Sequence, residues 1–119
     1  MGKKILVVDD DPSLVKMVDS YLTAHGYQVL VGTDGDEGLA KIKSDVPDLI
    51  ILDVQMPRMN GYTFVHECKK IPEAINVPII VLTAKQGMAE IFKVEGVKEY
   101  ITKPFAMEKL LESIKKHIN

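Results

Sequence analysis

Short, mainly apolar runs alternate along this chain with segments whose apolar residues follow helical spacing, and this alternation limits the choice of fold more than any other feature. A run that is apolar throughout, such as that at 49–52, is typical of a parallel strand in a sheet with helices on both faces. Strands are expected at 5–8, 28–31, 49–52, 78–82 and 99–102. Helices are expected from Pro12 to the His25-Gly26 pair, at 34–43, 62–70 and 88–95, and from Met107 onward. Alternation with right-handed crossovers predicts an α/β fold, a doubly wound sheet of five parallel strands with five helices.

The length and charge of the chain are those of one globular domain. It has 119 residues, and we expect residues 1–119 to form a single domain around one core. A formal net charge of −2 offers no basic surface for nucleic acid. No apolar stretch approaches the roughly 20 residues that a membrane span needs, and the single Cys68 suits a reducing compartment. We therefore expect a cytoplasmic domain that binds neither nucleic acid nor membrane.

Polar side chains follow four of the expected strands at their carboxyl ends. Asp9 and Asp10 follow the first strand, Asp53 the third, Thr83 the fourth and Lys103 the fifth. Ligands of doubly wound sheets bind outside the carboxyl ends of the strands, so these side chains are expected to share one pocket. Its carboxylates repel one another and need a cation, while a hydroxyl and an ammonium group suit phosphoryl oxygens.

Part of the first acidic cluster has a simpler interpretation. Asp11 precedes Pro12 at the start of an expected helix, where an aspartate commonly caps the helix N-terminus. We assign Asp11 to capping, and leave Asp9 and Asp10 for the pocket because Asp53 supplies a matching carboxylate. Histidines at 25, 66 and 117 show no ligand spacing and are expected to be surface residues or helix-end partners.

Four motifs, taken together, resemble the receiver domain of two-component response regulators, with similarity from about residue 3 to the C-terminus. They are KILVVDDDP at 4–12, LDVQMP at 52–57 followed by NG at 60–61, LTA at 82–84, and YITKPF at 100–105. The resemblance implies a flavodoxin-like fold with strand order 2-1-3-4-5. It also implies that the chain is a signalling phosphoprotein and not an enzyme, beyond assisting its own phosphorylation and dephosphorylation.

The resemblance also implies a role for each motif residue. Asp53 would accept a phosphoryl group from a phosphohistidine of a sensor kinase or a histidine phosphotransfer protein. Asp10, Asp53 and the backbone carbonyl of Gln55 would bind Mg²⁺ directly, and Asp9 would act mostly through water. The remaining roles concern the phosphorylated state. Thr83 and Lys103 would contact the phosphoryl oxygens, and Thr83 and Tyr100 would form the switch. Gln55 and Lys85 would tune the phosphoryl lifetime.

The output would pass to a downstream protein through the face made by the fourth helix, the fifth strand and the fifth helix. Thr83 and Lys103 are 20 positions apart, about two fewer than is usual in the family, so we expect a shortened or irregular fourth helix. Lys103-Pro104 is expected to be cis by resemblance. Ala106 stands where a capping residue is usual, so the last helix is expected to begin without a side-chain cap.

Two other functions fit parts of the sequence. A small aspartyl phosphatase of the haloacid dehalogenase type would use Asp9 as its nucleophile, but the late acidic pair that such enzymes need is missing. A degenerate receiver would serve as an interaction scaffold that does not depend on phosphate. Since all the chemical positions are filled, the phosphorylated switch is the preferred hypothesis. Tyr100 could also be an edge-strand aromatic that only packs.

Overall fold

The computed structural model describes residues 2–53, 61–83 and 97–118. Its centre is a sheet of five parallel strands in the order β2-β1-β3-β4-β5, which confirms the expected doubly wound topology. The strands are β1 (Lys4–Val8), β2 (Gln28–Gly32), β3 (Leu49–Asp53), β4 (Ile79–Thr83) and β5 (Glu99–Thr102). Asp53 and Thr83 are therefore the last residues of their strands and do not follow them.

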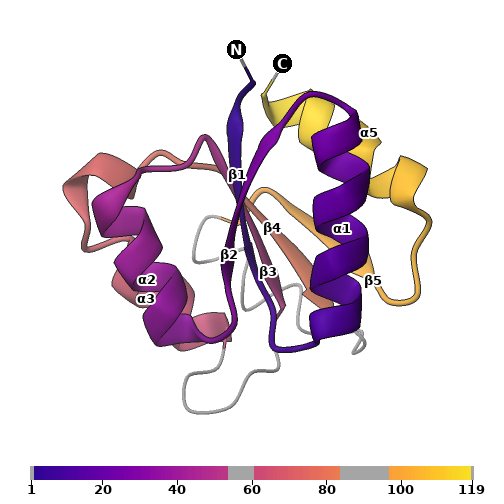
Figure 1. Cartoon of the computed structure of the whole chain (residues 1–119). Coiled ribbons are helices and arrows are strands. Elements are labelled where there is room, and N and C mark those ends of the chain that lie inside the picture. The colour runs from indigo at the N-terminus through magenta and orange to yellow at the C-terminus, as the bar shows by residue number, and fades with distance from the viewer. Residues whose placement is uncertain (1, 54–60, 84–96, 119) are drawn as a thin grey trace.

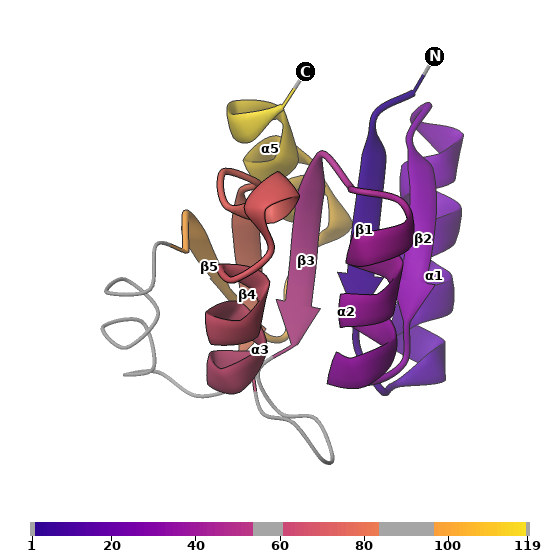
Figure 2. The same cartoon turned by 90° about the vertical axis from the view of Figure 1, so that its left-hand side faces the viewer.

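Helices cover both faces of the sheet (Figure 1, Figure 2). Within the described ranges they are α1 (Pro12–Ala24), α2 (Gly35–Ser44), α3 (Gly61–Cys68), α5 (Met107–His117) and a short 3-10 helix at Pro72–Ala74. α1 and α5 pack on one face, and α2 and α3 on the other (Figure 1). The expected fourth helix at 88–95 lies outside the described residues. None of the described helices is long and apolar enough to cross a bilayer.

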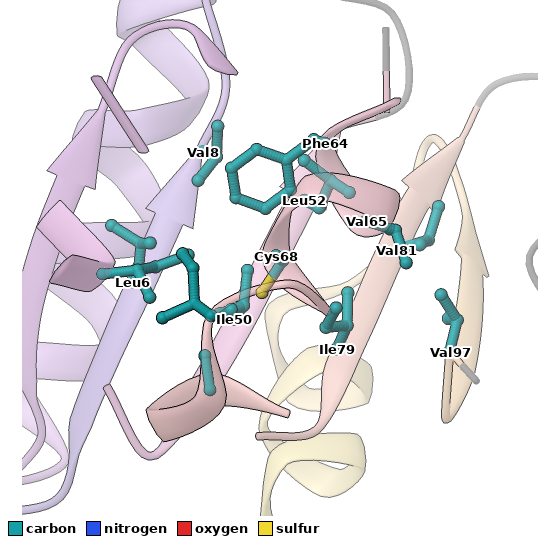
Figure 3. Packing of buried hydrophobic residues seen from close by; sticks show 13 residues of the cluster. Leu6, Val8, Ile50, Leu52, Phe64, Val65, Cys68, Ile79, Val81 and Val97 are labelled. Carbon is teal, nitrogen blue, oxygen red and sulfur yellow. The ribbon is translucent and has the colours of Figure 1, made fainter. Parts of the chain in front are cut away.

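The central strands are buried on both faces, as their uniformly apolar composition predicts. Every residue of β3 and β4 is buried. Ile50 and Leu52 join Phe64 in the cluster beneath α2 and α3 (Figure 3), whereas Leu49 and Ile51 face α1 and α5. This two-sided burial anchors the carboxyl ends of the strands firmly.

The first helix begins and ends as the sequence predicts. The Asp11 side chain accepts hydrogen bonds from the backbone N–H groups of Ser13, at 3.0 Å, and Leu14, at 3.4 Å, and Pro12 occupies the first turn. The chain leaves the helix through Gly26, whose φ of 94° is readily adopted by glycine. The capping assignment of Asp11 is confirmed.

The second helix packs through a glycine. Gly38 is buried, whereas Ala40 on the same helix is exposed. A Cβ atom at Gly38 would lie 2.9 Å from side-chain atoms of both Val8 and Phe64, so only glycine fits without movement. This close approach brings α2 directly onto β1 and α3.

In the second half of the chain, one helix end differs from the expectation and two local features agree with it. α3 ends at Cys68 and not at Lys70, because the chain turns toward Pro72, and the residue before a proline is disfavoured in a helix. α5 begins after Ala106 with no side-chain cap, as expected. Lys103-Pro104 is cis, which also agrees with the expectation.

Candidate functional site

The parallel register of the strands gathers the predicted polar residues at one edge of the sheet. Val8 of β1 is paired with Leu52 of β3, so the residues that follow them, Asp9 and Asp53, come to lie side by side. Asp53 is in turn paired with Leu82, which precedes Thr83. The backbone N–H of Lys103 donates to the carbonyl oxygen of Thr83 at 2.8 Å and brings the lysine to the same edge.

Three carboxylates converge within this edge. One oxygen each from Asp9, Asp10 and Asp53 lies within 4.8 Å of the others. Asp9 is 1% exposed and Asp53 6%, whereas Asp10 is exposed and faces the solvent side of the cluster. The structure therefore brings together the three predicted acidic ligands, while Gln55 lies outside the described residues.

Lys103 supplies the positive charge of the cluster. Its Nζ lies 3.2 Å from Oδ1 of Asp53, to which it donates a hydrogen bond, and 3.5 Å from Oδ2 of Asp9. The side chain of Lys103 is 27% exposed, so the ammonium group borders both the buried carboxylates and the solvent. Both contacts agree with the predicted shared pocket.

Asp9 is held in place by two hydrogen bonds. Its backbone N–H donates to Gly32, and its Oδ1 accepts a hydrogen bond from the backbone N–H of Asp11 at 3.0 Å. Burial raises the pKa of Asp9 above its usual value, and repulsion from Asp53 and Asp10 adds to this, although the Asp11 bond and Lys103 oppose it. Oδ2 is buried and accepts no hydrogen bond from the described residues. The hydrogen bond from Asp11 and the charge of Lys103 thus only partly offset the cost of burying the ionised carboxylate.

This donor set fits a magnesium ion. Mg²⁺ prefers carboxylate oxygens, keeps several waters and is commonly bound through one or two carboxylates together with phosphate oxygens. The buried Oδ2 of Asp9 and the exposed carboxylate of Asp10 offer further oxygen ligands close to Asp53. The pKa of Asp9 is raised mainly by burial and further by repulsion from Asp53 and Asp10, and a cation here would offset both effects.

The two predicted switch residues lie on the neighbouring strands β4 and β5. Thr83 is 4% exposed and is paired with Thr102 at the end of β5. Tyr100 is partly buried and packs against the cluster beneath α3, and burial raises the pKa of its phenol. The packing expected of an edge aromatic is thus present, and the switch role of Tyr100 stays a prediction. Lys85 lies outside the described residues.

An apolar groove adjoins the acidic edge and was not predicted. It has a volume of about 540 Å³ and is lined by Asp11, Ser13, Leu14, Met17, Lys103, Pro104, Phe105 and Met107. Met17 is 54% exposed beside it. The groove joins residues about 90 positions apart in the chain, so periodicity within either segment gives no signal for it.

Comparisons with known proteins agree on one family. The response regulator receiver domain pattern matches residues 5–115. The alkaline phosphatase synthesis transcriptional regulatory protein PhoP of Bacillus subtilis is 39% identical over 118 residues, which are 97% of this chain and 48% of PhoP. The chain thus spans about half the length of that relative.

Two solved structures extend the comparison to three dimensions. The chemotaxis response regulator CheY4 of Vibrio cholerae superposes with a TM-score of 0.94 at 34% identity, covering 99% of this chain and all of that one. The receiver domain of the sensor histidine kinase PA1611 of Pseudomonas aeruginosa gives a TM-score of 0.91 at 30% identity, covering 99% and 98% of the two chains. That structure has a magnesium ion coordinated in its active-site cleft.

Proposed function

Since the chain belongs to the response regulator receiver domain family and is a receiver of two-component signalling, we propose that Asp53 is the residue that accepts the phosphoryl group. The observation that carries this proposal is the contact of Lys103 Nζ with Asp53 Oδ1 at 3.2 Å, at an edge that also holds Asp9 and Asp10. Asp53 is 6% exposed at the end of its strand. It therefore combines a firm backbone position with cationic and acidic neighbours.

The proposed reaction transfers a phosphoryl group from nitrogen to oxygen. A carboxylate oxygen of Asp53 forms a bond to phosphorus as the bond between phosphorus and the donor imidazole breaks, and the imidazole leaves with the bonding electron pair and takes up a proton from water. The ammonium group of Lys103 already contacts Asp53, so it can follow the negative charge onto a phosphoryl oxygen. The Thr83 hydroxyl, at the end of the adjacent strand, is proposed to bind a second phosphoryl oxygen.

Mg²⁺ is the proposed cofactor. Asp10, Asp53 and the carbonyl of Gln55 would hold it directly, with Asp9 acting mostly through water. When bound, it neutralises charge on the phosphoryl oxygens in the transition state. The magnesium ion of the PA1611 receiver domain supports this assignment.

The proposed donor is a phosphohistidine of a sensor kinase or a histidine phosphotransfer protein. Such a protein has to cover the acidic edge to reach Asp53. The apolar groove adjoins this edge, because Lys103 lines the groove and also contacts Asp53. Leu14, Met17 and Phe105 give this surface an apolar character that suits protein contact. We propose that the donor protein packs against this groove. We also propose that the donor is phosphorylated, and transfers its phosphoryl group, in the cytoplasm.

The proposed output surface comprises the segment that contains the expected fourth helix, together with β5 and α5. Thr83 ends β4, and Tyr100 lies in the neighbouring β5, so a change at the phosphoryl site has a short path to this surface. Gln55 and Lys85 are proposed to tune phosphoryl lifetime. The chain would thus be modified stoichiometrically and would not turn over other substrates.

The testing experiment is intact mass spectrometry after exposure to acetyl phosphate with Mg²⁺. We expect the wild type to gain one phosphoryl group, Asp53→Asn to gain none, and Asp45→Asn to behave as wild type. Asp45 is a suitable control because it pairs with Lys4 at the opposite edge of the sheet. A folded wild type that binds Mg²⁺ but gains no mass would favour the phosphate-independent scaffold, and repeated turnover of a phosphate ester would favour a phosphatase.

A further inference from the structure

A second cluster of polar side chains joins the start of β5 to the last turns of α5, away from the acidic edge. Glu99, the first residue of β5, accepts a hydrogen bond at Oε2 from the hydroxyl of Ser113. His117 Nε2 lies 3.1 Å from Oε1 of Glu99, and Lys116 Nζ lies 3.9 Å from its Oε2. Because Ser113 and His117 are four residues apart, one carboxylate spans two successive turns on a single helix face.

This cluster is largely shielded from water. Ser113 is 1% exposed, and the side chains of Glu99 and His117 are 20% and 22% exposed. Burial pushes the pKa of Glu99 upward, but the hydrogen bonds from Ser113 and His117 and the charge of Lys116 outweigh it, so that the pKa is lowered. Ion pairs on open surfaces contribute little to stability, whereas hydrogen bonds to a shielded carboxylate contribute more.

The arrangement of the three groups excludes a nucleophilic role. An activated serine needs its hydroxyl hydrogen-bonded to a general base such as an imidazole. Here the Ser113 hydroxyl donates to the Glu99 carboxylate, and the imidazole of His117 contacts the other oxygen of the same carboxylate. The cluster is therefore a structural connection between a strand and a helix.

Glu99 makes this connection on one face of β5 only. Ile101, two residues further along the strand, packs with Leu110 and Ile114 of α5, and side chains two apart share a face of a strand. Tyr100 packs against the cluster on the α3 side of the sheet. The bonds of Glu99 thus hold α5 to the strand from the side opposite Tyr100.

We infer that the Glu99 carboxylate clamps α5 to β5, so that this helix and strand respond to the phosphoryl site as one rigid body. The exposed face of α5 is therefore expected to keep its shape when the chain is phosphorylated. The statement about phosphorylation rests on the function proposed above, whereas the clamp itself is a property of the unmodified chain.

Hydrogen exchange of α5 peptides, followed by mass spectrometry, tests the clamp in the unmodified protein. We expect Glu99→Ala to speed exchange in the last two turns of α5 by roughly tenfold or more, since local opening limits exchange there. Glu112→Ala is the matched control, because it removes an exposed glutamate from the same helix and should leave exchange within about twofold of wild type. Equal exchange in the two variants would overturn the clamp.

Two further measurements keep the test decisive. If Glu99→Ala does not fold, Ser113→Ala and His117→Asn each remove one bond, and both are expected to speed exchange in α5 but not in α1. In wild-type protein whose phosphorylation is verified by mass, exchange in α5 and in β5 is expected to stay within about twofold of the unmodified level. A large change in α5 on phosphorylation would refute rigid-body behaviour, whereas a missing phosphoryl mass would count against the proposed function alone.

Discussion

Lys103 Nζ lies 3.2 Å from Oδ1 of Asp53, although the two residues are 50 positions apart in the chain. The same ammonium group lies 3.5 Å from Oδ2 of Asp9, so one cation is shared between two buried carboxylates. Because one ammonium group contacts two carboxylates, the protein balances only part of the negative charge of the site.

Replacing Lys103 by methionine is expected to destabilise the Mg²⁺-free protein at neutral pH by about 1–3 kcal/mol, because it leaves buried carboxylates without their cation. Urea denaturation measures this change. Lys70→Met, which removes an exposed pair with Glu67, should cost at most about 1 kcal/mol. Saturating Mg²⁺ should recover part of the stability of Lys103→Met, and a loss no larger than that of Lys70→Met would contradict the shared-cation interpretation.

Asp9→Asn is expected to stabilise the Mg²⁺-free protein by on the order of 1 kcal/mol at neutral pH. The folded-state pKa of Asp9 is raised, so its ionisation costs stability as the pH rises through the interval between the unfolded and folded values. Asparagine keeps the Oδ1 acceptor for the Asp11 N–H and carries no charge. The same variant should bind Mg²⁺ more weakly. Urea denaturation is expected to show the gain in stability and calorimetric titration the loss of Mg²⁺ affinity, and a less stable Asp9→Asn variant would contradict the prediction.

Glu99→Gln should lower stability in a pH-dependent manner. The folded-state pKa of Glu99 is lowered, so its stabilising effect is present above the unfolded pKa and is lost as the pH falls through the folded value. The difference in unfolding free energy between wild type and Glu99→Gln is therefore expected to be largest at neutral pH and to shrink in acid. A difference that grows on acidification would refute this sign.

Two glycines near the site are expected to tolerate alanine unequally. A Cβ at Gly32 would lie 2.8 Å from backbone atoms of Gly38, whereas one at Gly38 would lie 2.9 Å from side-chain atoms of Val8 and Phe64. Backbone yields less than side chains, so Gly32→Ala should cost about 2–4 kcal/mol and Gly38→Ala about 1–2 kcal/mol. Thermal unfolding of the two variants checks the order.

Gln55→Ala and Lys85→Ala are expected to change the lifetime of the phosphoryl group more than the stability of the fold. Gln55 lies two residues after Asp53, and Lys85 lies two residues after Thr83. The measurement is the decay of phosphorylated protein by intact mass after removal of the phosphodonor. Unchanged decay in both variants would remove them from the proposed site.

Much of the site is predictable because parallel strands end at a common edge. The apolar runs predict the strands, and the polar residues that end or follow them, including Asp9, Asp53 and Lys103, come together whatever the details of helix packing. The cap at Asp11 is equally local, since it depends on neighbouring residues alone. These features need only the order and direction of the strands.

Features that depend on the exact placement of helices were not predictable. The apolar groove requires Met17 of α1 to lie beside Phe105 at the other end of the chain. The Glu99–His117 contact requires a particular register of α5 over β5, and that register is set by the packing of residues such as Leu110. The burial of Gly38 in α2 likewise reflects the space left by Val8 of β1 and Phe64 of α3.

The two ends of the described chain lie near each other at the edge of the sheet opposite the acidic site (Figure 1, Figure 2). β1 starts from that edge. β5 leads to Lys103 at the site, and α5 then runs back toward the edge from which β1 starts. An affinity tag, a fluorophore or a second domain joined at either end would therefore sit away from the surface that a phosphohistidine has to approach. Surface immobilisation through either end should leave the phosphorylation reaction accessible to its donor.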